Sequence, residues 1–341
     1  MPSVRPAVGL RCVTSARHAA GAPQEVFKEG AEHTGRHIGV VPGRDLGLMA
    51  RTSPYTISMA SWDQALLDEE QSKYVARQLS LPVVIRDLSW KLAYTKVLHV
   101  RAEAGDFVVK AAPPSNHHIE REITAYESYT EPLARRARTG QLVAADRAAN
   151  ILIATFQPGA LVEGTAYEFD PDIHEQAGSA LRTFHDQHAR VDDEYDIRAT
   201  QKTTALLDRQ HRIAPCIEVE ARRLLSAYRP ASIVVTPTHG DWQPRNWLIE
   251  KERLRVIDFG RFDFRPPSTD LCRLFTQQWK EAPELGDAFL RGYGADPRDE
   301  YVWPMDLLRE AIGTAVWAFR VGDVDFEAQG HRMLDEAIAR F

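Results

Sequence analysis

The sequence predicts an α+β fold with two lobes, an N-terminal antiparallel sheet plus one helix followed by a mainly helical C-terminal lobe. The chain has 341 residues, which exceeds the usual size of one compact domain and favours two lobes around a cleft. Short β-branched and apolar runs occupy residues 81–110, and an apolar stripe at helical spacing marks residues 173–188. We therefore expect one lobe at residues 59–158 and the other at residues 159–341.

The composition excludes several classes of protein. Apolar residues make up 44% of the chain and charged residues 26%, which rules out a wholly disordered protein. The longest apolar runs, such as residues 151–154, are far shorter than the roughly 18 residues that span a bilayer. The net charge of -6 and the three scattered cysteines argue against a nucleic-acid partner and favour a reducing cytoplasm. We expect a cytoplasmic monomer or weak dimer with no membrane partner.

Residues 1–58 are rich in Gly, Pro, Ala and Arg and show no sustained periodicity, so we predict a disordered extension there. Residues 1–24 contain arginines and no acid, a composition that resembles a transit peptide. Because that signal is weak, we favour a non-functional extension, or a start codon placed too early with Met49 or Met59 as later candidates.

Three short segments predict consecutive antiparallel strands: Val83–Ile85, Thr95–Val100 and Phe107–Lys110. Polar turns separate these strands. Lys110 closes the third strand, where a lysine can extend its charge into solvent. Its position alone therefore assigns no role to it.

The segment after this strand predicts a helix, because Ile119, Ile123 and Tyr126 form one apolar stripe. Glu122 flanks that stripe, so a helix docked on the sheet brings this carboxylate toward the interior, where it needs a cation such as Lys110. A strand lysine held by a helix glutamate is how kinases grip the α- and β-phosphates of ATP. Two separately solvated charges explain these residues equally well.

The segment Asn150–Gly159 is typical of a buried strand that exits into a Pro-Gly turn. If the chain crosses between the lobes here, the backbone between Ala154 and Phe156 is free to hydrogen-bond the edge of an adenine. A core strand that ends in a turn predicts the same residues, so this assignment depends on the motifs that follow.

Residues 233–260 carry the chemistry. Two β-rich segments, Trp247–Ile249 and Leu254–Ile257, flank a polar turn and predict a hairpin. A hairpin brings its two ends together, so Asn246 and Asp258 become neighbours. Their oxygen atoms are the ligands that Mg²⁺ prefers when nucleotide phosphates complete its shell.

Asp241 lies five residues before Asn246 and faces the same pocket. A carboxylate there can accept the proton of a hydroxyl group as that hydroxyl attacks a γ-phosphate. Each motif alone could be an ordinary turn. Their order and spacing, with Lys110 and Glu122 upstream, are much harder to obtain by chance.

With these motifs in place, the sequence resembles the aminoglycoside phosphotransferase and choline kinase family, which has a protein-kinase-like fold. The resemblance covers about residues 80–325 and rests on these segments: His239-Gly-Asp-Trp-Gln-Pro-Arg-Asn246, Val256-Ile-Asp-Phe-Gly260, Asp270-Leu271, Lys110, Arg121-Glu122 and Leu181-Arg-Thr-Phe-His185. It implies an ATP-dependent phosphotransferase that uses Mg²⁺ and acts on a hydroxyl group of a small molecule.

The resemblance also implies roles for single residues. By it, Asp241 is the catalytic base. Asn246 and Asp258 are the magnesium ligands, and Lys110 and Glu122 are the pair that grips the phosphates. Among the nucleotide-binding residues we also expect the backbone groups near Ala154 and Phe156, as set out above.

Four further positions are defined by the same comparison. Asp270 is the buried acid that steadies the catalytic loop, and His239 packs beneath that loop. The loop that would cover the phosphates contains no glycine, so it must bind them through other amides, with Ser89 as our candidate. Arg245 stands where a small residue is common in that family. We expect this difference to affect the part of the site that binds the acceptor.

The acceptor is the least defined part of this prediction. Residues 159–341 carry a net charge of -9, which favours a cationic, aminoglycoside-like substrate bound to an acidic face. The acids that could line such a site are Asp263, Asp287, Asp306, Glu310, Asp323, Asp325 and Glu327. A solvated acidic face explains the charge nearly as well. A metabolic kinase for choline, a sugar or an amino alcohol would share every site residue, whereas the intact site argues against a nucleotide-binding pseudokinase.

Overall fold

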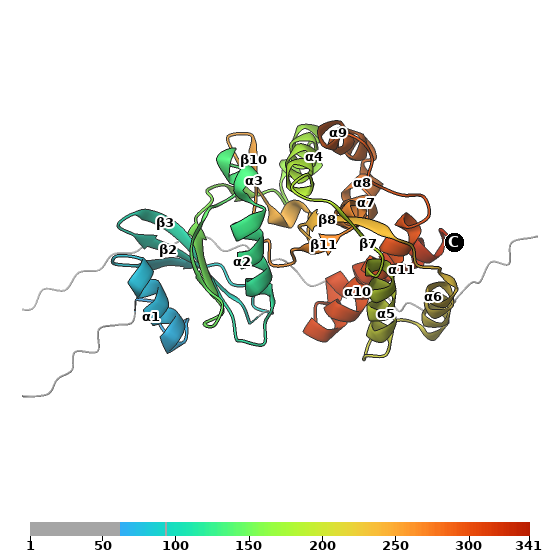
Figure 1. Ribbon diagram of the computed structural model, residues 1–341, viewed down its shortest axis with the longest axis horizontal. Helices are drawn as coiled ribbons and strands as arrows, with labels where there is room; N and C mark the ends of the chain where they lie inside the picture. Colours follow the sequence, from blue (N-terminus) through green and yellow to red (C-terminus); the bar gives the residue numbers. More distant parts are fainter. Residues whose placement is uncertain (1–61, 93) are drawn as a thin grey trace, which may run out of the picture. The chain divides into compact units, whose positions relative to one another are not determined.

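The computed structural model describes residues 62–92 and 94–341 (Figure 1). Our prediction of a disordered extension at residues 1–58 lies outside the described residues and stays a prediction. Ala60–Phe341 form one compact unit. None of the described helices is long and apolar enough to cross a membrane.

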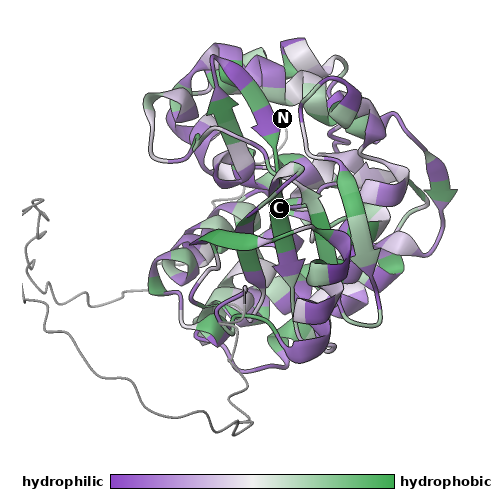
Figure 2. Cartoon of the chain, turned by 90° about the vertical axis from the view of Figure 1, so that its left-hand side faces the viewer, coloured by the Kyte–Doolittle hydropathy of each residue, from purple (hydrophilic) through white to green (hydrophobic). Residues whose placement is uncertain are grey.

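The N-terminal part of this unit is a five-stranded antiparallel sheet with the strand order β1-β2-β3-β5-β4. Its strands are β1 (Val83–Asp87), β2 (Lys96–Ala102), β3 (Gly105–Ala111), β4 (Leu142–Asp146) and β5 (Ile151–Thr155). The three strands predicted before residue 111 and the predicted strand after residue 150 are confirmed. Figure 2 shows that much of the strand sequence is apolar.

Helices cover both faces of this sheet. On one face, α1 (Glu69–Gln78) places Val75 against Leu98 and Val109. On the other face, α2 (His118–Ser128) packs the predicted Ile119 and Ile123 stripe against the sheet. Alternation along a strand explains the division, because neighbouring residues point to opposite faces. A short helix, α3 (Glu131–Arg135), follows α2.

The rest of the unit is mainly helical, as predicted. Its helices are α4 (Pro171–His185), α5 (Tyr195–Leu207), α6 (Pro215–Ala227), α7 (Cys272–Thr276), α8 (Gln278–Glu281), α9 (Glu284–Tyr293), α10 (Trp303–Val321) and α11 (Val324–Ile338). Three 3₁₀ turns accompany them at Ala166–Phe169, Pro244–Asn246 and Pro267–Leu271. Figure 1 shows these helices grouped beside the sheet.

Two small antiparallel sheets hold the segments that we expect to be catalytic. One has the order β10-β9-β6, from β6 (Ala160–Leu161), β9 (Trp247–Glu250) and β10 (Arg253–Val256). The other has the order β11-β8-β7, from β7 (Arg190–Asp192), β8 (Ile233–Thr238) and β11 (Asp263–Arg265).

The β9–β10 hairpin is the one that the sequence predicts. Its two turn residues, Lys251 and Glu252, have φ values of 50° and 60°, as a tight two-residue hairpin turn requires. At the open end, the Ile257 N–H donates to the Asn246 carbonyl over 3.0 Å. This pairing brings the two predicted magnesium ligands to neighbouring positions.

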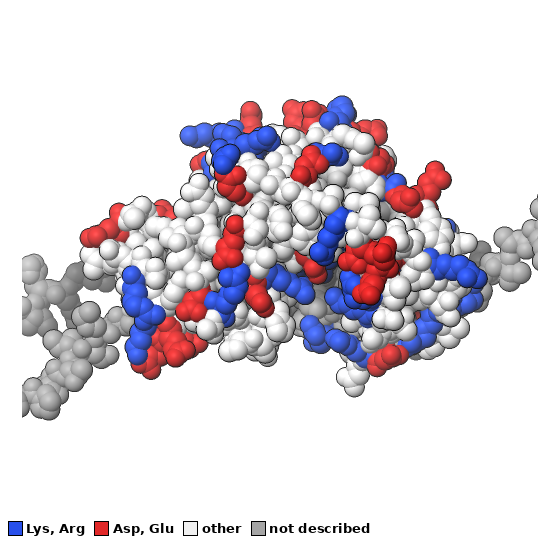
Figure 3. Space-filling view, in the orientation of Figure 1, with Lys and Arg blue, Asp and Glu red and all other residues white. Residues whose placement is uncertain are grey.

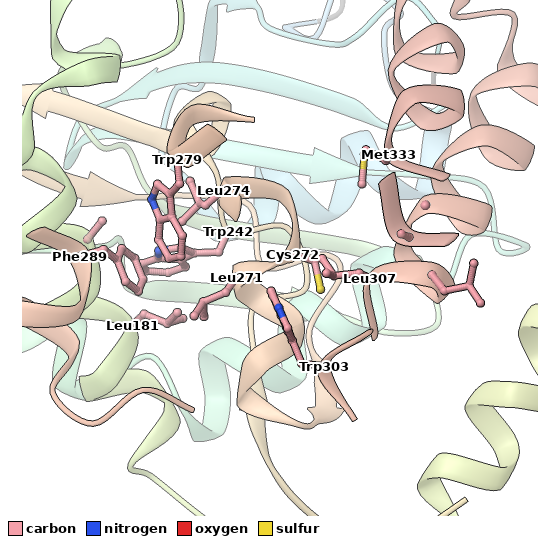
Figure 4. Close-up of a cluster of buried hydrophobic side chains, with 14 of the residues drawn as sticks. Leu181, Trp242, Leu271, Cys272, Leu274, Trp279, Phe289, Trp303, Leu307 and Met333 are labelled. Atoms are coloured by element: carbon pink, nitrogen blue, oxygen red, sulfur yellow. The ribbon is translucent and has the colours of Figure 1, made fainter. Parts of the chain in front are cut away.

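The core beneath the catalytic loop is aromatic (Figure 4). Trp242 is fully buried there and shares one cluster with Leu181, Leu271, Trp279 and Phe289. Because Trp242 directly follows Asp241, its burial anchors the loop that presents the carboxylate. Large aromatic side chains supply much of the apolar area that a core buries.

Candidate active site

Three charged side chains from different elements meet beside the sheet. The Lys110 ammonium on β3 donates to both Glu122 carboxylate oxygens on α2, over 2.8 and 2.9 Å. It also donates to Asp258 Oδ1 over 2.7 Å. Lys110 and Glu122 are both buried. The structure therefore shows one ion-pair cluster here and not two separately solvated charges.

This Lys110 cluster holds one cation and two carboxylates. Burial lowers the pKa of Lys110, but Asp258 and Glu122 outweigh it and raise the pKa above its ordinary value, so the ammonium stays charged. Burial raises the pKa of Glu122 despite its lysine partner. The Asp258 side chain is half exposed. The cluster thus presents excess negative charge at an exposed carboxylate.

Asn246 and Asp258 offer oxygen atoms that fit a magnesium ion. The Asn246 amide nitrogen donates to the Asp241 carbonyl over 2.8 Å and to Asp241 Oδ2 over 3.0 Å. Among the described residues, Asn246 Oδ1 and Asp258 Oδ2 accept no hydrogen bond. Asp258 has a φ of 67°, a strained backbone state that is typical of functional positions.

This donor set is small. Within residues 62–92 and 94–341, no group of three or more His, Cys, Asp or Glu side chains could hold a metal ion. One amide and one carboxylate therefore suit Mg²⁺ only when nucleotide phosphates and water complete its shell. The ion would arrive with the nucleotide.

The Asp241 carboxylate is buried among positive charges. Arg273 Nη1 and Gln243 Nε2 donate to its Oδ1, and Arg245 Nη2 donates to Oδ2 over 2.7 Å. Arg261 Nη1 lies 4.0 Å from Oδ1. Sequence reasoning noted Arg245 but missed the other three. Arg261 directly follows Asp-Phe-Gly and could have been found, whereas no sequence signal marks Arg273.

These arginines set the charge state of the expected base. Burial raises the pKa of Asp241, but the charges of Arg273, Arg245 and Arg261 outweigh it and hold the pKa well below the ordinary value. Asp241 is therefore a carboxylate at every physiological pH. It can accept a hydrogen bond from a hydroxyl group and orient that group.

A buried acid fixes the loop that carries Asp241. Asp270 accepts from the His239 N–H over 2.8 Å and from the Gly240 N–H over 2.6 Å. His185 Nε2 lies 3.1 Å from the same carboxylate. Gly240 has a φ of +80°, and a Cβ there would lie 2.4 Å from the Arg261 carbonyl, so only glycine fits. The expected role of Asp270 as the acid that steadies the loop is confirmed.

The nucleotide contacts expected of Ala154, Phe156 and Ser89 stay predictions, although the N–H groups of Phe156 and Ser89 already have partners. The Phe156 N–H donates to the Asp106 carbonyl over 3.0 Å, and Ala154 pairs within the sheet between β3 and β4. The Ser89 N–H donates to Asp87 Oδ1 over 2.8 Å, while its hydroxyl accepts from the Val97 N–H. These backbone N–H groups of Phe156 and Ser89 are not free, because the sheet and its edge loop already use them.

The loop after β1 also contacts the helical part. Trp90 stacks on Trp317 of α10 with ring centroids 5.6 Å apart. Phe326 of α11 meets Trp317 edge-on and lies beside the guanidinium groups of Arg245 and Arg273. An aromatic wall thus runs from this loop to the arginines around Asp241.

The chain belongs to the phosphotransferase enzyme family, because residues 92–303 match the model of that family. It is therefore a phosphotransferase, and its fold is the two-lobed, protein-kinase-like fold that the sequence predicts. No curated protein matches the chain in sequence.

Solved structures share this fold. A choline kinase from Streptococcus pneumoniae has a TM-score of 0.58 and 16% identity, with 79% of this chain and 97% of that chain covered. A macrolide 2'-phosphotransferase from Brachybacterium faecium has a TM-score of 0.53 and 16% identity, covering 79% and 98%. An aminoglycoside phosphotransferase in complex with ADP and hygromycin B has a TM-score of 0.54 and 12% identity, covering 79% and 97%. At these identities the likeness shows the fold alone.

Proposed function

We propose that the protein transfers the γ-phosphate of ATP to a hydroxyl group of a small molecule, with Mg²⁺ bound beside the phosphates. The observation that carries this proposal is a chain of contacts between the sheet and the segment from Asp241 to Asp258. Lys110 joins Glu122 to Asp258, and Asn246 joins the neighbouring segment to Asp241. Among the similar structures, one choline kinase contains AMP and an amicoumacin kinase contains AMP-PNP, which supports nucleotide use.

The proposed roles follow from the charges. Lys110, held by Glu122, binds phosphate oxygens. Asn246 and Asp258 would hold Mg²⁺, which would supply charge compensation on the phosphates. Asp241 hydrogen-bonds the acceptor hydroxyl and takes its proton as the oxygen bonds to the γ-phosphorus. The bond from that phosphorus to the β-phosphate oxygen breaks, and ADP leaves. A weak base suffices because such transition states are loose and need proton transfer only late.

The nature of the acceptor stays a prediction. The cationic, aminoglycoside-like substrate was expected from seven acids, but four of them have other partners. Ser268 donates to Asp306, Arg273 pairs with Glu310, Arg212 pairs with Glu327, and Asp323 caps α11. A metabolic kinase for an uncharged or differently charged hydroxyl compound is therefore the stronger candidate.

Two substitutions test the proposed roles. Asp241→Asn should bind Mg·ATP almost normally, because in the proposed mechanism Asp241 contacts the acceptor and no part of the nucleotide, while phosphate transfer falls by about 10² or more. Asp258→Asn should lose magnesium-dependent nucleotide affinity as well as turnover. Calorimetry with ATP, with and without Mg²⁺, measures binding, and a single-turnover assay measures transfer.

Asp335→Asn is the matched control, since Asp335 is exposed on α11 and should change neither quantity. Near-normal transfer by Asp241→Asn would contradict the mechanism at its main point. Loss of ATP binding in that variant would instead mean that the two acids share or exchange their roles.

A further inference from the structure

Arg261 connects the expected base to open solvent. Its side chain is 41% exposed, and its one ion pair among the described residues is the contact of 4.0 Å with Asp241. No hydrogen bond from its guanidinium group occurs in the described part of the chain. Three arginines surround Asp241: Arg245, Arg261 and Arg273. The side chain of Arg261 is the most exposed of the three.

Three further cations lie near Arg261. Arg265 on β11 donates to Thr238 Oγ1 over 3.1 Å and to the Arg261 carbonyl over 2.9 Å, so neutral acceptors fix its position. Its one acidic partner, Asp263, is 3.8 Å away. The side chains of Lys202 on α5 and Arg121 on α2 form no ion pair or hydrogen bond within the described residues.

Lys202 interacts electrostatically with the other three cations. Burial lowers the pKa of Lys202, and the charges of Arg265, Arg121 and Arg261 lower it further. Asp263 is the acid that opposes them. Figure 3 shows Lys and Arg side chains on the surface between α2 and α5, with Asp and Glu side chains among them.

Arg121, Lys202, Arg261 and Arg265, here termed the basic cluster, thus gather four positive charges against two carboxylates, Asp263 and Asp241. Like charges held close together repel each other, and a bound anion relieves that repulsion. Guanidinium groups suit the oxygens of carboxylate and phosphate, with which they form paired hydrogen bonds. Arg261 also lies beside Asp241, so an anion bound to this cluster lies next to the reacting hydroxyl.

We propose that the acceptor is a compact hydroxyl compound that carries a carboxylate or phosphate group, and that the basic cluster binds this group while Asp241 receives the hydroxyl. This assignment rests on the proposed phosphotransfer function. The anionic group is not consumed in the reaction. A quaternary or primary ammonium in the same place meets the arginines, so cationic acceptors are rejected.

A matched acceptor series tests the proposal: glycerol, glycerate, glycerol 3-phosphate and ethanolamine, assayed for ADP release with Mg·ATP. We expect glycerate or glycerol 3-phosphate to exceed glycerol by about tenfold or more in kcat/KM, the scale of a charge-assisted hydrogen bond. Ethanolamine should not exceed glycerol. Preference for glycerol or ethanolamine would overturn the proposal.

Binding measurements distinguish an anion that belongs to the acceptor from a free anion such as inorganic phosphate. With Mg·AMP-PNP present, inorganic phosphate and glycerate should raise the melting temperature of the wild type, and glycerol should not. Lys202→Gln and Arg121→Gln should each weaken the effect about tenfold in anion concentration. Arg209→Gln removes one exposed charge just beyond α5 and should leave it unchanged. Binding of phosphate without competition against any acceptor would assign the cluster to a separate anion site and overturn the acceptor assignment.

A different set of results is expected if the proposed phosphotransfer function itself is wrong. In that case Mg·AMP-PNP would not bind, and no acceptor of any charge would stimulate ADP release, whatever the anions do. Equal loss of anion binding in Arg209→Gln and Lys202→Gln would show general charge attraction and would also contradict the proposal.

Discussion

The Lys110 cluster and the surroundings of Asp241 use the same kinds of side chain in opposite proportions. Near the sheet, one lysine serves two carboxylates, Glu122 and Asp258. Around Asp241, one carboxylate meets three arginines, of which Arg273 is also paired with Glu310. The first arrangement therefore has a net negative charge, and the second has a net positive charge.

The difference indicates which species each side receives. Excess negative charge suits a metal ion that arrives with a nucleotide. Excess positive charge suits an anionic partner and disfavours a cationic one. Asn246 donates to the Asp241 carboxylate and its carbonyl accepts from the residue before Asp258. The negative and the positive region therefore adjoin at the place where we propose that phosphate is transferred.

The largest effect on stability should come from Arg273, which is 5% exposed. Arg273→Met leaves Glu310 without its partner and Asp241 with weaker compensation. Removing one member of a buried ion pair costs about 3 kcal/mol or more of the free energy of unfolding. Urea denaturation measures the loss.

Arg245→Met is the control for Arg273, since its side chain is one-third exposed and contacts the same carboxylate. This substitution should lower the free energy of unfolding by less than about 1 kcal/mol. Equal losses in both variants would mean that burial of the arginines does not distinguish them.

The pairing of Lys110 with Glu122 should appear as coupling. Each alanine variant should weaken use of ATP to a similar degree, and the double variant should be scarcely worse than either. We expect a coupling energy of about 2 kcal/mol from a double-mutant cycle in kcat/KM for ATP. Fully additive losses would show that the two side chains act independently.

Asp306 is a buried carboxylate like Asp241, but its pKa is shifted in the opposite direction. Burial raises its pKa to about 7 although Arg309 lies 3.5 Å away, whereas three arginines keep Asp241 ionised. Because the folded state holds this proton more tightly than the unfolded chain, the contribution of Asp306 to stability is greatest at low pH and is lost as pH rises from about 4 to 7.

Asp306→Asn should remove that contribution. Its stability relative to the wild type should improve by up to about 1 kcal/mol per pH unit across this range, measured by denaturation at pH 5, 6, 7 and 8. A constant difference at all four pH values would show that Asp306 does not titrate there.

The smallest effect should come from deleting residues 1–58. Both charge clusters are formed entirely within the described residues, so activity and melting temperature should stay nearly unchanged. A loss of several degrees on truncation would show that the deleted segment contributes to stability.

Much of the fold follows from local patterns in the sequence. Alternating and β-branched runs predicted the strands, and the Ile119 and Ile123 stripe predicted the helix that docks on the sheet. The hairpin alone placed Asn246 beside Asp258. These predictions succeeded because periodicity and turn chemistry act over a few residues.

The Lys110–Glu122 pair could also be predicted from the sequence, since kinase-like sites place their residues at regular positions on these elements. Lys110 and Glu122 lie twelve residues apart, and the strand and helix that carry them both have clear patterns. The sequence did not reveal that the N–H groups of Ser89 and Phe156 already have hydrogen-bond partners. Hydrogen bonds of a sheet edge depend on which strand or loop lies beside it.

The charge around the acceptor was decided by the tertiary structure. Arg273 contacts Asp241 from 32 residues away, and Lys110 reaches Asp258 across 148 residues. The basic cluster draws Arg121, Lys202 and Arg261 from three distant parts of the chain. A net charge of -9 over residues 159–341 favoured a cationic substrate, but four of the seven acids behind that prediction have other partners, and arginines gather around Asp241. A sum of charges along a sequence carries no information about where side chains meet, because electrostatic interactions depend on distance in space and on burial.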